Sequence, residues 1–447
     1  MSKTFRAYDM NQQLLLPPDL RQWLRDDHLA LYVSDVVEAL DLSAFINSYE
    51  EGDLRGRPPY HPALMVKLLV YGYCTGRMSS RRLEQATYDD VAFRVLCCDQ
   101  HPDHDSIAAF RKRHLVALGQ LFVQVLQLCQ RAGLVKLGHV AIDSTKIKAN
   151  AAKSESLRYD SLEATAQALE AEVVRLLSEA QRIDDEEDTL YGVGRRAAEL
   201  PDELRRRETR LAKIRQLKVE MEREAQQAAE QEQQQKASAE PKNYRRRRWS
   251  KNEQGEVVPK DKTRRNLTDP ESRLMMDLST NSYQQAYSTQ IAVDAQAQII
   301  VGTYVTSAPN DQEQLIPTVL EVKKNLGQLP ATVSADAGYF SSAVVTADVL
   351  RDIDLYVPPN EPEPSAITEA AGVRAQMWQK LLSGPGRKLY NRRGTIVEPV
   401  FAYIKHVRRF RQFSLRGLAA VQGEWWLICL THNLLKLFRA IRPLPTT

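Results

Sequence analysis

The segment from His139 to Asn150 constrains the fold of this 447-residue chain more than any other. Its apolar and β-branched residues predict a short strand, and Asp143 lies in the middle of it. A carboxylate inside a sheet is costly unless a cation pairs with it, and a hard metal ion such as Mg²⁺ suits bare carboxylate oxygens. The alternative is a solvated strand-end aspartate that caps the next turn, which is the commoner case for an isolated Asp.

The bulk composition predicts a cytoplasmic protein of two to four domains. Hydrophobic residues make up 43% of the chain, enough for a real core, and the five cysteines are too few and too irregularly spaced for a disulfide framework. No apolar stretch follows Met1–Arg6 and no uncharged run is long enough to span a bilayer, so we expect neither a signal peptide nor a membrane segment. The net charge of +4 says little about partners, whereas the distribution of charge says more.

Residues 1–133 are predicted to form an all-α domain. Residues 63–73 are mostly apolar, as expected of a well-buried helix, and apolar residues recur at helical spacing over 115–129. Hydroxyl and carboxyl side chains precede the helices that begin near residues 79 and 105. The arginines of this domain leave two interpretations open. They either form solvated faces of a helical bundle or contact DNA.

Residues 160–280 are predicted to be an insertion built around an antiparallel coiled-coil hairpin. Heptads run through 162–183 and again through 200–221, with acidic residues and glycines between them. Residues 224–240, rich in Gln, Glu and Ala, are expected to be a linker. Four consecutive arginines then follow, and they suit either a DNA backbone or a solvated charge run: Arg245, Arg246, Arg247 and Arg248.

A mixed α/β domain is predicted for residues 134–159 and 281–414, with a separate C-terminal helix in 415–447. Strands are expected at 289–294, 299–305, 331–335 and 353–357, and helices at 311–325, 341–350, 398–410 and 415–438.

Three acidic residues stand where such a domain would form a site. Asp143 lies on the first strand, Asp336 follows a buried strand, and Glu398 lies on a predicted helix. Three such carboxylates could hold two Mg²⁺ or Mn²⁺ ions for phosphoryl transfer. Asp294, also at a strand end, is expected to tolerate replacement by Ala.

Basic residues surround the third of these acids. Between Arg387 and Arg416 the chain has nine lysines and arginines, and Glu398 is the only acidic residue. A single carboxylate kept in a basic segment is expected beside nucleic-acid phosphates.

At these residues the chain resembles the DDE transposases of bacterial insertion sequences, whose catalytic domain has the RNase H-like fold. Ile142–Thr145 is similar to the family's first-aspartate strand, and Ala335–Tyr339 is similar to its second. The Tyr…Arg…Glu…Lys signature corresponds to Tyr390, Arg393, Glu398 and Lys405. Four residues separate Arg393 from Glu398, where the signature is usually quoted with three. Residues 56–62 and 102–104 also resemble the family's helical leader domain.

The resemblance implies a function. The substrate would be double-stranded DNA, both the element's own inverted-repeat ends and the target, and the reactions would be hydrolytic nicking and strand transfer. Asp143, Asp336 and Glu398 would bind the metal ions. The DNA phosphates would be bound by a wider set of residues, namely Tyr390, Arg393, Lys405, Arg408, Arg409 and the four arginines of 245–248. A homodimer or higher homo-oligomer in the bacterial cytoplasm, associated with the nucleoid, is expected.

Two other functions remain open from the sequence. A nuclease or resolvase-like enzyme would keep the fold and cut DNA without joining it. A non-catalytic DNA-binding or scaffold protein would use the hairpin and the arginine run. The three carboxylates argue against the scaffold, because a binding protein gains nothing from anions that face phosphate.

Overall fold

The fold is given by a computed structural model, which describes residues 19–49, 58–191, 202–237, 249–277, 281–360 and 372–441. The four consecutive arginines, Arg245–Arg248, lie outside these residues, as do residues 56 and 57 of the leader motif. No helix in the described ranges combines the length and the apolar character that crossing a membrane requires.

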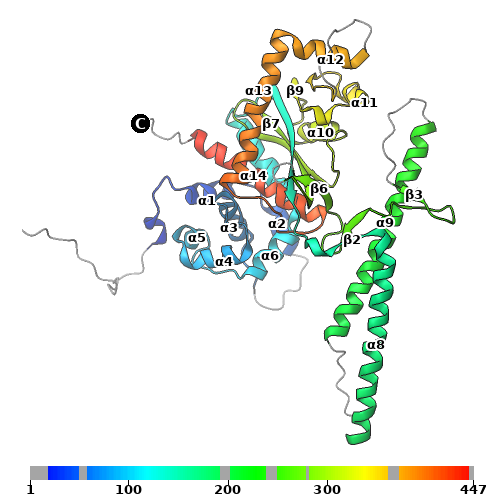
Figure 1. The fold of residues 1–447 in the computed structure, drawn as a ribbon. Helices are drawn as coiled ribbons and strands as arrows, with labels where there is room; N and C mark the ends of the chain where they lie inside the picture. The colour runs from blue at the N-terminus through cyan, green and yellow to red at the C-terminus, as the bar shows by residue number, and fades with distance from the viewer. Residues whose placement is uncertain are drawn as a thin grey trace, which may run out of the picture.

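A six-stranded mixed sheet forms the centre of the molecule (Figure 1). Its order is β10-β9-β1-β7-β6, and β8 pairs with β7 beside β6. β1, β9 and β10 run parallel to one another, whereas β7 is antiparallel to β1, β6 and β8. The strand bounds are β1 (His139–Lys148), β6 (Arg273–Asp277), β7 (Ser282–Asp294), β8 (Ile300–Thr306), β9 (Thr332–Ser334) and β10 (Asp354–Tyr356).

The predicted strands are therefore present, and one strand of this central sheet was not foreseen. β6 falls within the segment 160–280 that was expected to be an insertion, yet it pairs with β7 from Arg273↔Ala286 to Asp277↔Ser282. Its exposed residues alternate with buried Met275, which is the pattern of a strand with one covered face.

Helices connect and cover the strands of this sheet. Their bounds are α10 (Leu315–Leu326), η4 (Ala337–Tyr339), α11 (Ser342–Val345), η5 (Asp348–Leu350), α12 (Gly372–Leu382), α13 (Gly384–Ala402), the π-helical turn η6 (Tyr403–Val407) and α14 (Leu418–Ile441). The helix predicted at 398–410 has the wrong bounds. α13 begins at Gly384, where Ser383 accepts a hydrogen bond from the Gly386 N–H at 3.1 Å. Two glycines and a proline in its first turn lower the helix propensity that the sequence displays there.

The N-terminal residues are helical, as predicted. The elements are η1 (Leu20–Trp23), α1 (Leu29–Ala39), α2 (Ser43–Ile46), η2 (Asn47–Tyr49), α3 (Pro62–Cys74), α4 (Ser80–Asp89), α5 (Val91–Leu96), α6 (His104–Arg113) and α7 (Leu115–Arg131). Asp103 caps α6 by accepting from the Ser106 N–H at 2.8 Å.

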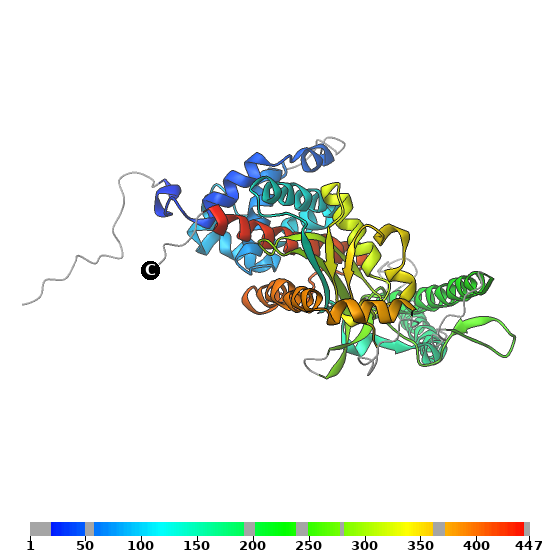
Figure 2. The ribbon, with the colours of Figure 1, turned by 90° about the horizontal axis from the view of Figure 1, so that it is seen from above.

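The helix α14 packs on both the N-terminal helices and the sheet (Figure 2). It contacts α7 and α3 on one side and β8 on the other, and its apolar residues belong to one core shared with both. A buried polar chain also crosses this junction. Arg111 Nη1 donates to the Tyr73 hydroxyl at 2.8 Å, and that hydroxyl donates to Glu424 Oε1 at 3.2 Å. The N-terminal helices therefore share their core with the last described helix.

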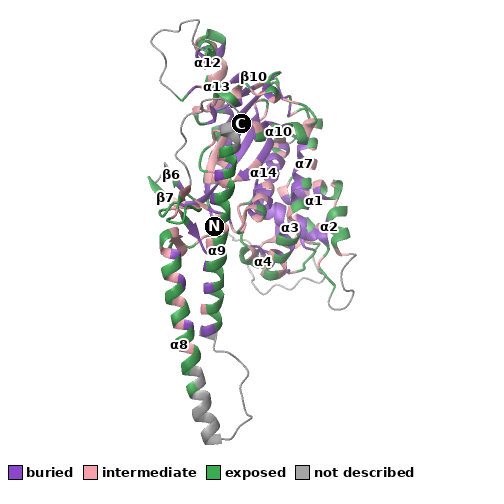
Figure 3. Ribbon diagram, turned by 90° about the vertical axis from the view of Figure 1, so that its right-hand side faces the viewer, coloured by how far each residue is buried: buried purple, intermediate pink, exposed green. Residues whose placement is uncertain are grey.

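Two long helices, α8 (Tyr159–Tyr191) and α9 (Asp202–Ala237), form an arm that projects from the body (Figure 1). They run antiparallel, since Lys218 pairs with Glu163 at 2.5 Å while Arg215 pairs with Glu170 at 2.8 Å. Apolar side chains from both helices form a separate core at the base of the arm. In Figure 3 the ribbon of the arm is coloured exposed over much of its length, with buried positions interspersed. That the pair is a coiled coil stays a prediction.

The linker predicted at 224–240 is wrong over most of its length, because α9 continues without a break to Ala237. Gln, Glu and Ala are good helix formers, so their low complexity did not prevent a helix. Short strands lie at the base of the arm, namely β2 (Ser156–Arg158) with β5 (Arg264–Asn266), and β3 (Trp249–Lys251) with β4 (Val257–Pro259).

Candidate active site

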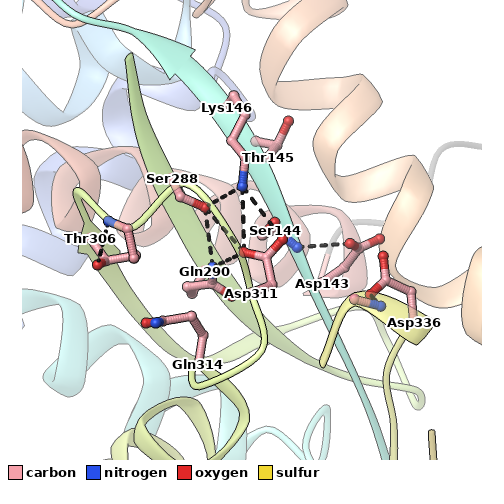
Figure 4. Close-up of polar contacts among 12 residues, drawn as sticks. Asp143, Ser144, Thr145, Lys146, Ser288, Gln290, Thr306, Asp311, Gln314 and Asp336 are labelled. Atoms are coloured by element: carbon pink, nitrogen blue, oxygen red, sulfur yellow. Dashed lines mark hydrogen bonds and ion pairs between the residues drawn. The ribbon is translucent and has the colours of Figure 1, made fainter. Parts of the chain in front are cut away.

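Asp143 on β1 and Asp336 just beyond the end of the neighbouring parallel strand β9 lie at matching positions. The last register pair between β1 and β9 is Ala141↔Ser334; Asp143 follows two residues later within β1, and Asp336 two residues later in the turn after β9. Because side chains alternate along strands and adjacent strands are about 4.8 Å apart, this register brings the two carboxylates together on one face. Figure 4 shows them side by side.

The carboxylate of Asp143 is half-enclosed, with 18% of its side chain exposed. Its Oδ1 accepts a hydrogen bond from the Ser144 N–H at 2.7 Å, and its Oδ2 accepts one from Arg393 Nη1 at 3.0 Å. Burial raises the pKa of Asp143 to about 6; Arg393 opposes the rise, and the neighbouring Asp336 adds to it. A carboxyl whose pKa is raised in this way, beside a second carboxyl, is a candidate for catalysis or cation binding.

Asp336 begins the turn that follows β9. Its Oδ1 accepts from the Gly338 N–H at 2.9 Å, and a Cβ at Gly338 would lie 3.1 Å from that oxygen. Glycine therefore suits this tight approach. Burial raises the pKa of Asp336, Arg393 opposes the rise, and Asp311 adds to it.

Arg393, on α13, provides the positive charge of this site. Its side chain is 17% exposed and forms the ion pair with Asp143, and its guanidinium carbon lies 6.0 Å from the ring centre of Tyr390. With the usual three intervening residues, the arginine of the signature would fall at position 394, which is a glycine. The signature alone therefore left open whether Arg393 takes the role of that arginine. The contact with Asp143 supports Arg393.

Glu398 does not join the two aspartates. It is exposed on α13, and a Cβ at Gly394 would lie 2.8 Å from its Oε1, so its side chain lies along its own helix. Five residues advance an α-helix by about 140° beyond a full turn, so Arg393 and Glu398 point in different directions. Across the described ranges, no group of three His, Cys, Asp or Glu side chains could hold a metal ion.

The donors present fit a divalent cation in part. Asp143 and Asp336 offer adjacent carboxylate oxygens, the ligands that Mg²⁺ and Mn²⁺ prefer, and their repulsion is the kind that a bound cation relieves. Arg393 supplies the charge that balances Asp143, and the third carboxylate is turned away.

A polar cluster that the sequence did not reveal adjoins the aspartates. Lys146 Nζ donates to Ser288 Oγ at 2.9 Å and lies 3.4 Å from Asp311 Oδ2, and Gln290 Nε2 donates to Asp311 Oδ1 at 2.7 Å (Figure 4). The hydroxyl of buried Tyr339 donates to Gln290 Oε1. The register pair Lys146↔Ser288 explains the first contact. Asp311, expected to begin the helix at 311–325, lies instead in the polar loop before α10, which begins at Leu315.

The remaining basic residues expected to bind DNA differ in how far they are buried. Lys405 is half-buried and donates to the Lys146 carbonyl at 3.3 Å, and burial lowers the pKa of its amine. Arg409 is exposed. Arg408 corrects the prediction of a DNA contact, because it is 3% exposed and donates to Thr431 Oγ1 at 2.5 Å and to the Ile428 carbonyl at 2.9 Å.

Asp294, which is expected to tolerate replacement by Ala with activity retained, is held in a network of backbone hydrogen bonds. It is 1% exposed, and Oδ2 accepts from the Lys136 and Leu137 N–H groups at 3.2 and 2.7 Å. Oδ1 accepts from the Gln296 N–H at 2.8 Å. The carboxylate thus satisfies two backbone donors just before β1 and one in the turn after β7, and it is no candidate for a metal ligand.

Comparison with known families adds to this geometry. The family described as Transposase domain (DUF772) matches residues 18–113, and the family described as Transposase DDE domain matches residues 276–434. No curated protein and no solved structure matches the chain. The first match covers the N-terminal helices, and the second covers most of the sheet, Asp336, Arg393 and Glu398.

Proposed function

Because the chain belongs to the DDE transposases of insertion sequences, we propose that it binds the terminal inverted repeats of its own element and catalyses metal-dependent DNA cleavage and strand transfer. The observation that carries this proposal is the pairing of Asp143 with Asp336 two residues beyond the parallel register of β1 and β9. The strand order β8-β7-β1-β9-β10, with β7 antiparallel to β1 and β9 parallel to it, supports an RNase H-like fold.

The proposed roles follow from position. Asp143 and Asp336 are the first metal ligands, and Glu398 is the third. Glu398 reaches the pair only if its side chain leaves Gly394 and α13 turns, which would also release Arg393 from Asp143. Mg²⁺ or Mn²⁺ ions, two by analogy with other phosphoryl-transfer sites, would activate the attacking oxygen and stabilise the leaving one.

The side chains of the protein itself orient the DNA. Arg393, once free of Asp143, can bind a phosphate with two parallel hydrogen bonds, and Tyr390 packs near its guanidinium. Lys405 and exposed Arg409 supply further charge for the backbone. Lys146 and Asp311 hold the strand that bears Asp143 in register with β7.

The remaining expectations are part of the same proposal. The helical residues 1–133 and the arm within 160–280 serve DNA binding and the assembly of a homo-oligomer on paired ends, and residues 134–159 and 281–414 form the catalytic domain. Arg245–Arg248 add sequence-independent affinity. We propose that the protein acts in the cytoplasm on nucleoid DNA.

The test is cleavage of a labelled inverted-repeat end by purified variants, with DNA binding measured in Ca²⁺. Asp143→Ala, Asp336→Ala and Glu398→Ala should abolish cleavage and leave binding intact. Asp348→Ala is the matched control, because its side chain is 96% exposed. Full activity of Asp143→Ala or Asp336→Ala would refute the proposal. An active Glu398→Ala would remove only the third ligand.

A strand-transfer assay with pre-nicked ends separates a transposase from a nuclease of the same fold. Joined products are expected. Cleavage without any joining would favour the nuclease, and terminal inverted repeats flanking the gene would favour the transposase.

A further inference from the structure

Beyond the aspartates, one edge of β1 pairs with no further strand of the central sheet in the described residues, and cations lie along it. β9 pairs only with His139–Ala141 on this side, whereas β7 covers the other side as far as Lys148. Along the free edge, Arg393 contacts Asp143, Lys405 contacts the Lys146 carbonyl at 3.3 Å, and the segment that bears exposed Arg411 pairs with Lys148. These contacts define a basic row that follows β1 away from the site.

The row ends at Arg416. Its Nε donates to the Asn150 carbonyl at 2.9 Å, and Asn150 Nδ2 donates to the Ser414 carbonyl at 2.7 Å, so this loop is fastened to the end of β1. Asn150 lies seven positions after Asp143 in the chain. In a strand this separation spans roughly 23 Å, about seven base pairs of DNA.

Arg416 also lines a pocket of ≈ 440 Å³ between the arm and the body. Four further cations of the pocket come from one face of α9: Arg205, Arg206, Arg210 and Lys213. Glu155 is the only acidic side chain in the described lining, and it pairs with Arg210 at 3.0 Å.

The other three arm cations, Arg205, Arg206 and Lys213, are exposed. Within the ranges that the structure describes, none of them has a carboxylate partner. A concave surface with five cations and one anion concentrates positive potential, which favours an anionic ligand.

We propose that this pocket, the arm-base pocket, binds the phosphodiester backbone of the DNA about seven base pairs from the scissile phosphate. The inference rests on the proposed function and names a second contact for the same duplex. Arginine matches phosphate geometry through paired hydrogen bonds, and Arg416 belongs to both the basic row and the pocket. One duplex lying along β1 would therefore reach both.

The experiment compares two triple variants of α9. Arg205→Gln/Arg206→Gln/Lys213→Gln removes the three arm cations of the pocket that have no carboxylate partner among the described residues. Arg215→Gln/Lys218→Gln/Arg223→Gln removes the same charge from elsewhere on the helix, where two of the three already pair with glutamates at exposed positions of little energetic weight. Equal melting temperatures would establish that both variants fold.

Affinity for an end duplex of about 30 base pairs, which spans three helical turns, is measured against salt in Ca²⁺. The pocket variant should lose up to about 0.9 in the slope of log affinity against log salt for each contact removed, roughly fivefold in affinity per contact at physiological salt. Hydroxyl-radical protection about seven base pairs from the cleavage site should disappear. The control variant should keep the slope and the protection.

An unchanged slope in the pocket variant, or an equal loss in the control, would overturn the inference. A changed oligomeric state with an unchanged slope would overturn it in favour of an acidic segment of a second copy. The catalytic proposal is judged separately, on a duplex cut about five base pairs from the scissile bond, too short to reach the pocket. Wild type and the pocket variant should both cleave it. If neither cleaves any duplex, the catalytic proposal fails while the salt slope still decides the pocket.

Discussion

Arg393 Nη1 lies 3.0 Å from Asp143 Oδ2, although 250 positions separate the two residues in the chain. One ion pair thus ties α13 to β1 at the point where the carboxylates meet. The guanidinium lowers the pKa of Asp143 without overcoming the effect of burial, so the pKa stays near 6. The negative charge of Asp143 is therefore only partly compensated by the side chains of the protein itself.

Because burial outweighs the ion pair with Arg393, the free energy of unfolding is predicted to depend on pH. The pKa of Asp143 is raised on folding, so its ionisation opposes folding, and stability is lost as pH rises from about 4 to about 6. A shift of this size corresponds to about 3 kcal/mol. Asp143→Asn should therefore change the free energy of unfolding of the metal-free protein more favourably at pH 7.5 than at pH 4, by up to about 3 kcal/mol. Urea unfolding of the variant and the wild type at both pH values measures this difference. An equal effect at both pH values would contradict this.

Arg408 and Arg409 are adjacent and should behave differently. Arg408→Gln breaks buried hydrogen bonds to Thr431 and Ile428 and should lower the free energy of unfolding by about 3 kcal/mol. Arg409→Gln should leave stability unchanged and reduce the salt dependence of DNA binding by up to about 0.9. Thermal melts and binding titrations on both variants distinguish the two roles. The reverse pattern would restore Arg408 as the DNA contact.

Tyr73→Phe should weaken the junction between the N-terminal helices and α14. The change leaves Arg111 and Glu424 buried without the hydroxyl that joins them, at a cost of about 1–3 kcal/mol. Tyr71→Phe is the control, since it removes a hydroxyl from the same helix for which the described residues offer no hydrogen bond. Equal melting temperatures of the two variants would show that the chain of contacts adds nothing.

Asp294→Ala should destabilise the protein by about 2–4 kcal/mol, because two backbone N–H groups just before β1 and one in the turn after β7 lose their acceptor. Asp294→Asn retains one acceptor oxygen and should cost less. Urea unfolding of both variants, with Asp348→Ala as the exposed control, measures the difference. A fully stable Asp294→Ala protein would mean that water replaces the carboxylate.

The sequence predicted the pattern of the sheet because alternation and turn residues are local signals. It also predicted that Asp143 and Asp336 are neighbours, since Asp143 lies on one strand of the sheet and Asp336 directly follows another, and these strands are adjacent and parallel. It did not separate Arg408 from Arg409, because a run of arginines has no helical period that tells the buried face from the exposed one. Nor could it assign Lys146 to Asp311, whose contact depends on a register and a loop that are set far along the chain. For Glu398, the sequence suggests the role of third metal ligand, but its exposed side chain lies apart from the two aspartates in the structure.

The packing of α14 against α7 has a consequence for how the protein is made. About 300 residues separate the two helices along the chain, so the N-terminal core cannot close when its own helices leave the ribosome. At roughly 5–20 residues per second, α14 follows α7 by about 15–60 seconds. During that time the apolar face of α7 is uncovered, and it is a surface that a chaperone can bind. A messenger RNA that ends before α14 would yield N-terminal helices without their packing partner. Such truncated chains would keep the apolar face of α7 uncovered, whereas the full-length transposase covers it.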